Sequence, residues 1–440
     1  MTRYRASRLP QHRGRAAWNE ILGAQPVPNV LSGDRTADIV VIGAGFAGLS
    51  AARRLHQIDP AARIVVLDAG RVAEGAAGRN SGFMIDLPHD LASEDYAGSG
   101  DDKAQIALNR RAIAFARDAV EAYGIEPAFF DEVGKVNGAV GQAAQAHNRR
   151  YAEHLNNLGE ACELLDARQM RELTGSAYYA SGLYTPGTVM LQPAGYIRGL
   201  AAGLSSAVDL YENTAATGFA RSGDSWDVFT KGGKIAAQKI ILTVNGHLES
   251  FGFARRRLLQ VFLFAMMTRD LGGDAPIGAP RWGITPSDPM GTTVRRIDPA
   301  LGGNRIVTRT CAVMRPGMTV GLTDMGRAAK VMLRKFDSRF PALAGTKMDY
   351  IWAGHLCLSL NGVAVAGELR PGVFSGCVQN GLGTARGTLT GIAAAEAALG
   401  VTSDIGEHFA AEPPPKRLPP MTRLGANMVM RWREWRARDE

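Results

Sequence analysis

The chain has 440 residues, 46% hydrophobic and 21% charged, which allows two domains and is typical of a soluble globular protein. It contains no run of 18 apolar residues, so the sequence predicts no transmembrane helix. The net charge of +8 comes largely from arginines near the two ends, which usually form solvated tails, and a nucleic-acid partner is not expected. Four separated cysteines without a C-x-x-C pair indicate neither a disulfide framework nor a metal site, and a cytoplasmic location is expected.

Residues 1–36 are expected to form an extended arm. Pro26 and Pro28 keep its backbone out of helix, and Trp18 and Ile21 are the apolar residues expected to anchor it. The Arg-rich, acid-poor start is also typical of a transit peptide, and the sequence leaves that alternative open.

A nucleotide-binding motif follows the arm. The apolar run 38–42 predicts a buried parallel strand, and it leads directly into Gly43, Gly45 and Gly48 in the spacing G-x-G-x-x-G. The first glycine permits a tight turn, the second lets the backbone approach a pyrophosphate, and the third lets the following helix, 46–57, pack on the strand. The N-terminus of that helix is expected to attract the phosphates.

An acidic residue at the end of the next strand strengthens this prediction. The apolar run 64–67 is followed by Asp68, which lies 20 residues after Gly48. At that spacing a carboxylate accepts hydrogen bonds from the adenosine ribose. Because a carboxylate would repel a 2′-phosphate, NADP is the least favoured dinucleotide.

The loop after Asp68, Gly75–Gly82, reads G-A-A-G-R-N-S-G. Its small residues would let backbone N–H groups approach a flat ring or a phosphate. Beyond it, a helix over 101–123, a strand over 135–140 and a helix over 143–158 show no Rossmann pattern and predict a second domain.

From about residue 187 the chain is expected to return to the first domain, with strands at 189–191, 208–211 and 240–244 and a helix at 193–204. The apolar run 258–267 then predicts a central strand of another sheet, with Phe262, Phe264 and Met266 on one face. Near the end, a strand at 373–375, a glycine-rich turn and a helix over 385–399 would direct a second helix N-terminus at an electron-rich group.

With both glycine-rich turns in view, the sequence resembles the D-amino acid oxidase superfamily of FAD-dependent oxidoreductases, in its gamma-glutamylputrescine oxidase-like and glycine or sarcosine oxidase-like branch. The resemblance is carried by A-D-I-V-V-I-G-A-G-F-A-G-L-S-A-A, G-A-A-G-R-N-S-G, I-I-L-T-V-N-G, W-A-G-H-L-C-L-S-L-N-G-V-A-V-A-G and N-G-L-G-T, in that order from residue 37 to about 400. It implies an α/β fold in which a Rossmann-like FAD-binding domain (1–95, 186–250 and 350–410) is interleaved with an antiparallel-sheet substrate domain (96–185 and 251–349), followed by a basic tail (411–440).

The resemblance also implies the cofactor, FAD, and the residues that hold it. Those expected to contact FAD are Gly43, Gly45, Phe46, Ala47, Gly48, Asp68, Ala69, Ala77, Gly78, Arg79, Asn80, Ser81, Gly82, Ala216, Asn245, Gly246, Gly381, Leu382, Gly383 and Thr384. The cofactor is expected to be non-covalent, but Cys357 lies near the position through which some sarcosine oxidases attach FAD. Sarcosine-type members place a lysine just after the second G-x-G, where this chain has Ala385 and Arg386, so their carboxylate clamp does not carry over.

The reaction implied is oxidation of the C–N bond of a small amine or amino acid to an imine by hydride transfer to flavin N5, followed by hydrolysis, with O2 or another electron acceptor. Catalytic residues are not identified; candidates for the substrate pocket are Phe262, Phe264, Met266, Arg309, His355 and Asn361. If Arg309 faces the flavin, a carboxylated amine is favoured.

Two alternatives remain. One is a dehydrogenase that passes electrons to quinone and docks on a membrane through its basic tail with Trp432 and Trp435. The other is a flavin-dependent RNA-modifying protein, which only the positive charge suggests.

Overall fold

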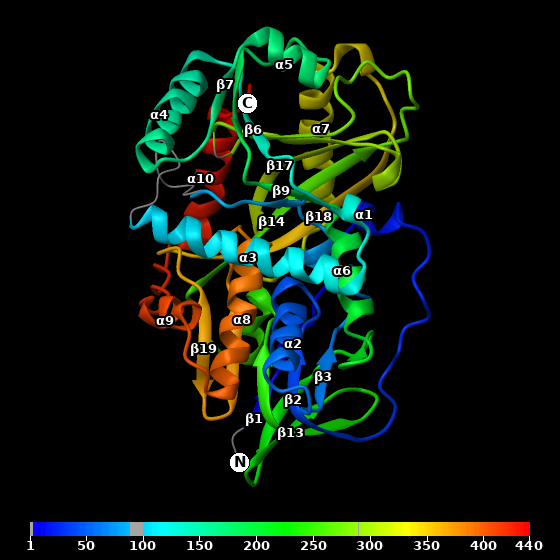
Figure 1. Ribbon diagram of the computed structural model, residues 1–440, viewed down its shortest axis with the longest axis vertical. Coiled ribbons are helices and arrows are strands. Elements are labelled where there is room, and N and C mark those ends of the chain that lie inside the picture. Colours follow the sequence, from blue (N-terminus) through cyan, green and yellow to red (C-terminus); the bar gives the residue numbers. More distant parts are fainter. Residues whose placement is uncertain (1–2, 89–99, 289) are drawn as a thin grey trace.

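The protein folds into two large β-sheets, and helix α3 (Asp102–Tyr123) crosses the level between them in Figure 1. The structure is a computed structural model that describes residues 3–88, 100–288 and 290–440. The chain passes between the two sheets several times, so each sheet is assembled from distant segments.

The lower sheet in Figure 1 has nine strands and contains the predicted nucleotide-binding unit. Its centre is parallel, in the order β20-β13-β2-β3-β10, because the continuous apolar runs are buried on both faces. Its strands are β1 (Arg3–Arg5), β2 (Arg35–Ile42), β3 (Ile64–Leu67), β10 (Asp209–Tyr211), β11 (Gly218–Ser222), β12 (Ser225–Phe229), β13 (Lys234–Leu242), β19 (Val365–Arg370) and β20 (Val373–Cys377).

The upper sheet has eight strands in the order β18-β14-β17-β16-β15-β6-β8-β7. All neighbours are antiparallel except β15 and β6, so the sheet is mixed. Its strands are β6 (Lys135–Ala139), β7 (Glu163–Leu165), β8 (Ser181–Thr185), β14 (Leu258–Thr268), β15 (Trp282–Pro286), β16 (Thr293–Ile297), β17 (Arg305–Met314) and β18 (Met348–Ser359). A small third sheet joins β4 (Phe83–Met84), β9 (Val189–Leu191) and β5 (Phe130–Asp131).

The predicted α/β fold with two sheets is confirmed, and β14 is the predicted internal strand, paired with β17 and β18 on its two sides. Two segments differ from the expected domain limits, and one is helix α3, expected in the second domain, which packs in a core cluster with residues of β2 and β3. Strand β18, expected with the first domain, belongs to the upper sheet, because its apolar residues pair along the full length of β14.

Several helices, including the two expected after residue 100, end at glycines in the left-handed conformation. The two helices expected after residue 100 are present, and Gly124 and Gly159 terminate them in the αL conformation. The helices other than α3 are α1 (Ala17–Glu20), α2 (Phe46–Ile58), α4 (Gln142–Leu158), α5 (Ala167–Thr174), α6 (Pro193–Gly203), α7 (Leu322–Arg339), α8 (Ala385–Leu399), α9 (Asp404–Ala411) and α10 (Thr422–Arg436). Among the described residues, none of these helices is both long and apolar enough to cross a bilayer.

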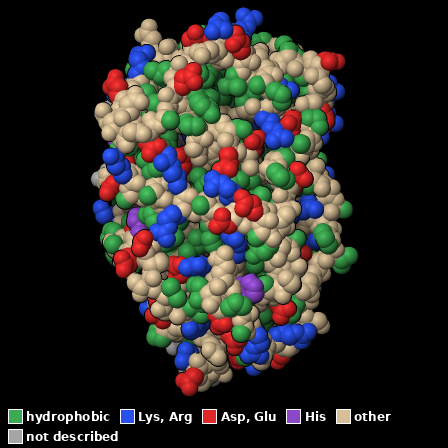
Figure 2. All heavy atoms as spheres, viewed as in Figure 1, with side chains coloured by type: hydrophobic (Ala, Val, Ile, Leu, Met, Phe, Trp, Pro, Cys, Tyr) green, Lys and Arg blue, Asp and Glu red, His purple; other side chains and the backbone are tan. Residues whose placement is uncertain are grey.

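Both terminal segments of the chain are held against the rest of the protein by hydrogen bonds. In the expected N-terminal arm, Trp18 is fully buried and its indole N–H donates to Asn80 O at 2.9 Å, which confirms it as an anchor. The C-terminal segment is not a solvated tail, because α10 packs against β17 and Glu440 Oε1 accepts hydrogen bonds from the backbone N–H groups of Val140 and Gly141. On the face shown in Figure 2, basic and acidic side chains are interspersed, so the net positive charge forms no single patch there.

Candidate functional site

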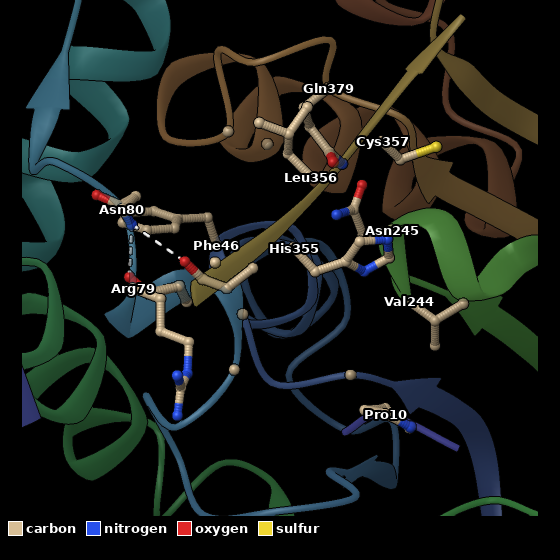
Figure 3. A pocket seen from close by; sticks show the side chains of 18 of the residues that line it. Pro10, Phe46, Arg79, Asn80, Val244, Asn245, His355, Leu356, Cys357 and Gln379 are labelled. Carbon is tan, nitrogen blue, oxygen red and sulfur yellow. Dashed lines mark hydrogen bonds between the residues drawn. The ribbon is translucent and has the colours of Figure 1, made fainter. Parts of the chain in front are cut away.

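A cavity of about 450 Å³ lies where the two sheets meet. Its walls come from the loops after β2, β3 and β13 of the lower sheet and from β14, β17 and β18 of the upper sheet. In Figure 3, Arg79 and Asn80 lie on one side of the cavity, and Val244, Asn245 and Cys357 lie on the other. Among the described residues that line it, Asp68 is the only acid, whereas Arg8, Arg79 and Arg309 also reach the wall.

Two glycines of the first loop, Gly43 and Gly48, leave no room for a side chain. A Cβ on Gly43, which has φ +111°, would lie 2.7 Å from Thr243 O, and a Cβ on Gly48 would lie 1.7 Å from Gly43 O. Helix α2 begins at this loop with Gly45 as its N-cap and without a side-chain cap. The backbone of the first turn is therefore presented to the cavity, where it favours an anion.

Asp68, at the end of β3, organises the same loop. Its carboxylate accepts hydrogen bonds from Ala44 N at 2.8 Å and from Gly70 N at 2.9 Å. Burial in the cavity wall raises the pKa of Asp68 to about 6, although these two N–H groups favour the ionised form.

A second helix N-terminus meets the cavity from the end of the chain. The turn 379–384 lines the wall, and α8 begins after Thr384, again without a side-chain cap. The Thr384 hydroxyl instead donates to Phe83 O at 2.7 Å and holds the turn against the segment that follows the 75–82 loop. Arg386 points elsewhere and pairs with Glu412.

The two helices are held together by glycines of α8. A Cβ on Gly387 would lie 3.2 Å from Phe46 Cβ, and a Cβ on Gly391 would lie 2.1 Å from Ala47 O. Because these glycines let α8 contact the first turn of α2, the two N-termini have a fixed separation.

The 75–82 loop contributes backbone and small side chains. Asn80 stabilises it from within, since its Oδ1 accepts from Gly82 N at 2.7 Å and its Nδ2 donates to Ala77 O at 2.6 Å. The Arg79 guanidinium turns into the protein and donates to Ala353 O and Arg13 O, both at 3.1 Å. Burial lowers the pKa of Arg79 to about 10, so it remains a cation at neutral pH.

Two neutral histidines and a thiol form another part of the wall. His355 Nε2 is 2.9 Å from Gln260 Oε1, and its ring lies edge-on to that of His247, with ring centres 5.6 Å apart. Burial lowers the pKa of His355 to about 3 and that of His247 to about 4. The same burial raises the pKa of the Cys357 thiol well above its usual value, so it is protonated at neutral pH.

Arg309 of β17 reaches the cavity at the edge of the 75–82 loop. Its Nε donates to Ser81 Oγ at 3.3 Å and its Nη2 to the hydroxyl of Thr293, the cross-strand neighbour, at 3.0 Å. Phe264 and Thr285 line the same cavity from β14 and β15. This wall combines a guanidinium, hydroxyl groups and an apolar surface.

The structure brings most of the predicted residues to this cavity, but not all. Those that line it are Gly43, Gly45, Phe46, Ala47, Asp68, Ala69, Ala77, Arg79, Asn80, Ser81, Ala216, Asn245, Gly381, Leu382, Gly383, Thr384, Phe264, Arg309 and His355. Behind the wall lie the tightly packed glycines Gly48, Gly78, Gly82 and Gly246.

Three of the substrate-pocket candidates lie away from the cavity. Phe262, Phe264 and Met266 share one face of β14 and one core cluster beneath the upper sheet, as the alternation predicts, but of the three only Phe264 also lines the cavity. Asn361 follows β18 and binds the C-terminal linker, accepting from Lys416 N at 3.0 Å.

Part of the cavity wall, formed by the N-terminal arm, was not predicted from the sequence. Residues 8–12, with Ala6, line the cavity, and Pro10 is seen at its edge in Figure 3. The arm is held on both sides, since Ala6 N donates to Thr217 O at 2.9 Å and Arg13 O accepts from Ala353 N at 3.0 Å. No motif marks this segment; only its contacts reveal its position.

These features fit FAD. Two helix N-termini without side-chain caps, on α2 and α8, face a single cavity whose backbone is bare of side chains at both ends. If FAD binds here, the N-terminus of α2 would hold its phosphates and the N-terminus of α8 would lie near its flavin.

Comparison with known proteins also indicates an FAD-binding protein. The family described as FAD dependent oxidoreductase (DAO) matches residues 38–397. The chain is 26% identical over 381 residues to a probable oxidoreductase OrdL of Haemophilus influenzae, with 83% of each protein covered. It is 25% identical over 356 residues to the gamma-glutamylputrescine oxidoreductase of Escherichia coli K12, with 77% of this chain and 78% of that protein covered. The crystal structure of glycine oxidase from Geobacillus kaustophilus superposes with a TM-score of 0.69 at 18% identity, covering 84% of this chain and 96% of that one. The chain therefore belongs to the DAO family of FAD-dependent oxidoreductases.

Proposed function

We propose that the protein oxidises the C–N bond of a small amine that also carries a carboxylate, such as an amino acid. The observation that carries this proposal is the position of Arg309, which lines the cavity beside Ser81 of the loop expected to face the flavin. A guanidinium recognises a carboxylate with two parallel hydrogen bonds, a geometry that an ammonium group does not offer.

The electrostatics of the cavity support the same class of substrate. Apart from Asp68 at the end of β3, the described lining residues include no carboxylate, so no acidic side chain is present to hold an ammonium group of the substrate. The amine is therefore expected to react in its neutral form while the carboxylate orients the molecule. The gamma-glutamylputrescine oxidoreductase that this chain resembles is also named for a compound with both groups.

The remaining wall would position the substrate and exclude water. Flavin, when bound, supplies a two-electron acceptor for the C–H bond next to nitrogen. Phe264 offers an apolar surface, and the neutral rings of His247 and His355 do not change charge between pH 5 and 8. The chemistry then depends on orientation more than on a dedicated base.

Anaerobic bleaching of the flavin absorbance tests the proposal, with matched panels of amino acids and of amines that lack a carboxylate. We expect the wild-type protein to be bleached faster by the carboxylated panel. Arg309→Gln should raise KM for carboxylated substrates by roughly 10- to 100-fold, the loss of one charge-assisted interaction. Arg309→Lys keeps the positive charge but lacks the planar pair of donors, so its KM for carboxylated substrates should lie between those of the wild type and Arg309→Gln. An equal loss for both panels would contradict a carboxylate clamp.

A further inference from the structure

Helix α10 is oriented with polar side chains toward the protein. Asn427 Oδ1 accepts from Met314 N at 2.8 Å, and its Nδ2 donates to Met314 O at 3.2 Å. About two turns further, Glu434 accepts from Ala312 N at 2.7 Å and pairs with Arg327 of α7 at 3.0 Å. These contacts provide hydrogen-bond partners for backbone groups of Ala312 and Met314, in the part of β17 that extends beyond its pairing with β16.

The opposite side of α10 and the residue before it are apolar and exposed. Met421, Met428, Trp432 and Trp435 have exposed fractions of 67%, 73%, 52% and 62%. Their spacings of 7, 4 and 3 residues place all four on one stripe of a helix. A helix on the surface of a globular protein usually turns such a stripe inward, so this one has the reverse orientation.

Arginines flank the stripe. Arg433, Arg436 and Arg438 are exposed, and the single acid of the helix, Glu434, is turned toward the protein. The Arg436 guanidinium lies 5.0 Å from the ring centre of Trp432, and that of Arg438 lies 4.8 Å from the ring of Trp435. The outer face of the helix is therefore apolar and cationic.

We propose that α10 is a docking surface for an anionic lipid surface, on which it lies flat with the Met421, Met428, Trp432 and Trp435 stripe inserted at the headgroup level. Tryptophan prefers this level because its ring is apolar and its N–H is polar, and nearby arginines attract anionic headgroups. A second copy of the chain is a less favourable occupant, since a symmetric contact would oppose the arginines of two identical faces. The inference does not depend on the substrate proposed above.

Co-sedimentation of the holoprotein with vesicles tests this inference, using phosphatidylcholine alone or mixed with phosphatidylglycerol, at low and high salt. We expect binding to the mixed vesicles at low salt, with at least a tenfold loss for Trp432→Ser/Trp435→Ser and a marked loss at high salt. The matched control, Val27→Ser/Leu164→Ser, changes two apolar residues that are 92% and 49% exposed elsewhere and should bind as the wild type does.

The tryptophan variant should keep its flavin and its thermal midpoint, because the altered side chains are exposed. Absence of wild-type binding to anionic vesicles, or equal binding by the tryptophan variant, would overturn the inference. So would a wild-type dimer in solution that the same variant converts to monomer, because a second copy would then cover the stripe.

Discussion

The contact between α8 and the first turn of α2 makes a quantitative prediction at Gly391. In Gly391→Ala the new Cβ would lie 2.1 Å from Ala47 O, whereas ordinary contact begins at 3.4 Å, so the helices must separate by about 1.3 Å. The partner is backbone and cannot rotate away. Alanine gains about 1 kcal/mol of helix propensity, but overpacking typically costs about 1–3 kcal/mol.

The displacement should affect FAD more than it affects folding. A shift of about 1 Å in the first turn of α2 would lengthen its phosphate hydrogen bonds beyond a useful distance. Each such bond to a charged group contributes about 1.5–3 kcal/mol, so the Kd for FAD should rise at least tenfold per lost bond. Flavin fluorescence quenching on titrating the apoprotein with FAD measures this directly.

A matched substitution separates packing from helix propensity. Gly326 lies inside α7, and a Cβ there would meet nothing within 4 Å. Gly326→Ala should therefore bind FAD as the wild type does and be more stable by about 1 kcal/mol. Wild-type FAD affinity in Gly391→Ala would refute the view that this contact holds the phosphate-binding turn in place.

Three further predictions concern the walls of the cavity. Burial lowers the pKa of His247 from 6.5 to about 4, so between these pH values the unfolded chain binds a proton that the folded protein does not, and stability falls as pH drops. His247→Gln should remove about 2 kcal/mol of the stability loss between pH 7 and pH 4.5, measured by urea unfolding. Replacing residues 9–12 of the N-terminal arm by Gly and Ser should make FAD dissociate roughly tenfold faster, because these residues line the cavity. The dissociation rate is measured from the rise in flavin fluorescence after dilution. Because burial keeps the Cys357 thiol protonated and poorly reactive, we expect no covalent link to flavin, and acid precipitation should leave the flavin in the supernatant. A yellow pellet that is absent in Cys357→Ala would instead show a covalent link.

How much of the site the sequence predicts depends on whether backbone or side chains form it. The glycine turns at 43–48 and 381–384 were predictable because bare backbone next to a helix start has few other uses. The substrate wall was less predictable. Alternation along β14 correctly places Phe262, Phe264 and Met266 on one face, but that face packs into the core, and of the three only Phe264 also reaches the cavity. The N-terminal arm carries no motif at all, since its position depends on contacts with residues more than 200 positions away.

The expected FAD contacts and the proposed substrate contacts lie on different parts of the fold. The expected FAD contacts lie on the lower sheet and its helices, whereas Phe264, Thr285 and Arg309 lie on the upper sheet. The 75–82 loop touches both, because Ser81 contacts Arg309 of the upper sheet and Ala77 lies beside Gly45, where a Cβ would be 3.7 Å from Ala77 Cβ, at the start of α2. Changes on β17 should therefore alter substrate preference with little effect on FAD affinity, whereas changes in this loop should alter both, because it is the element on which the two sets of contacts converge.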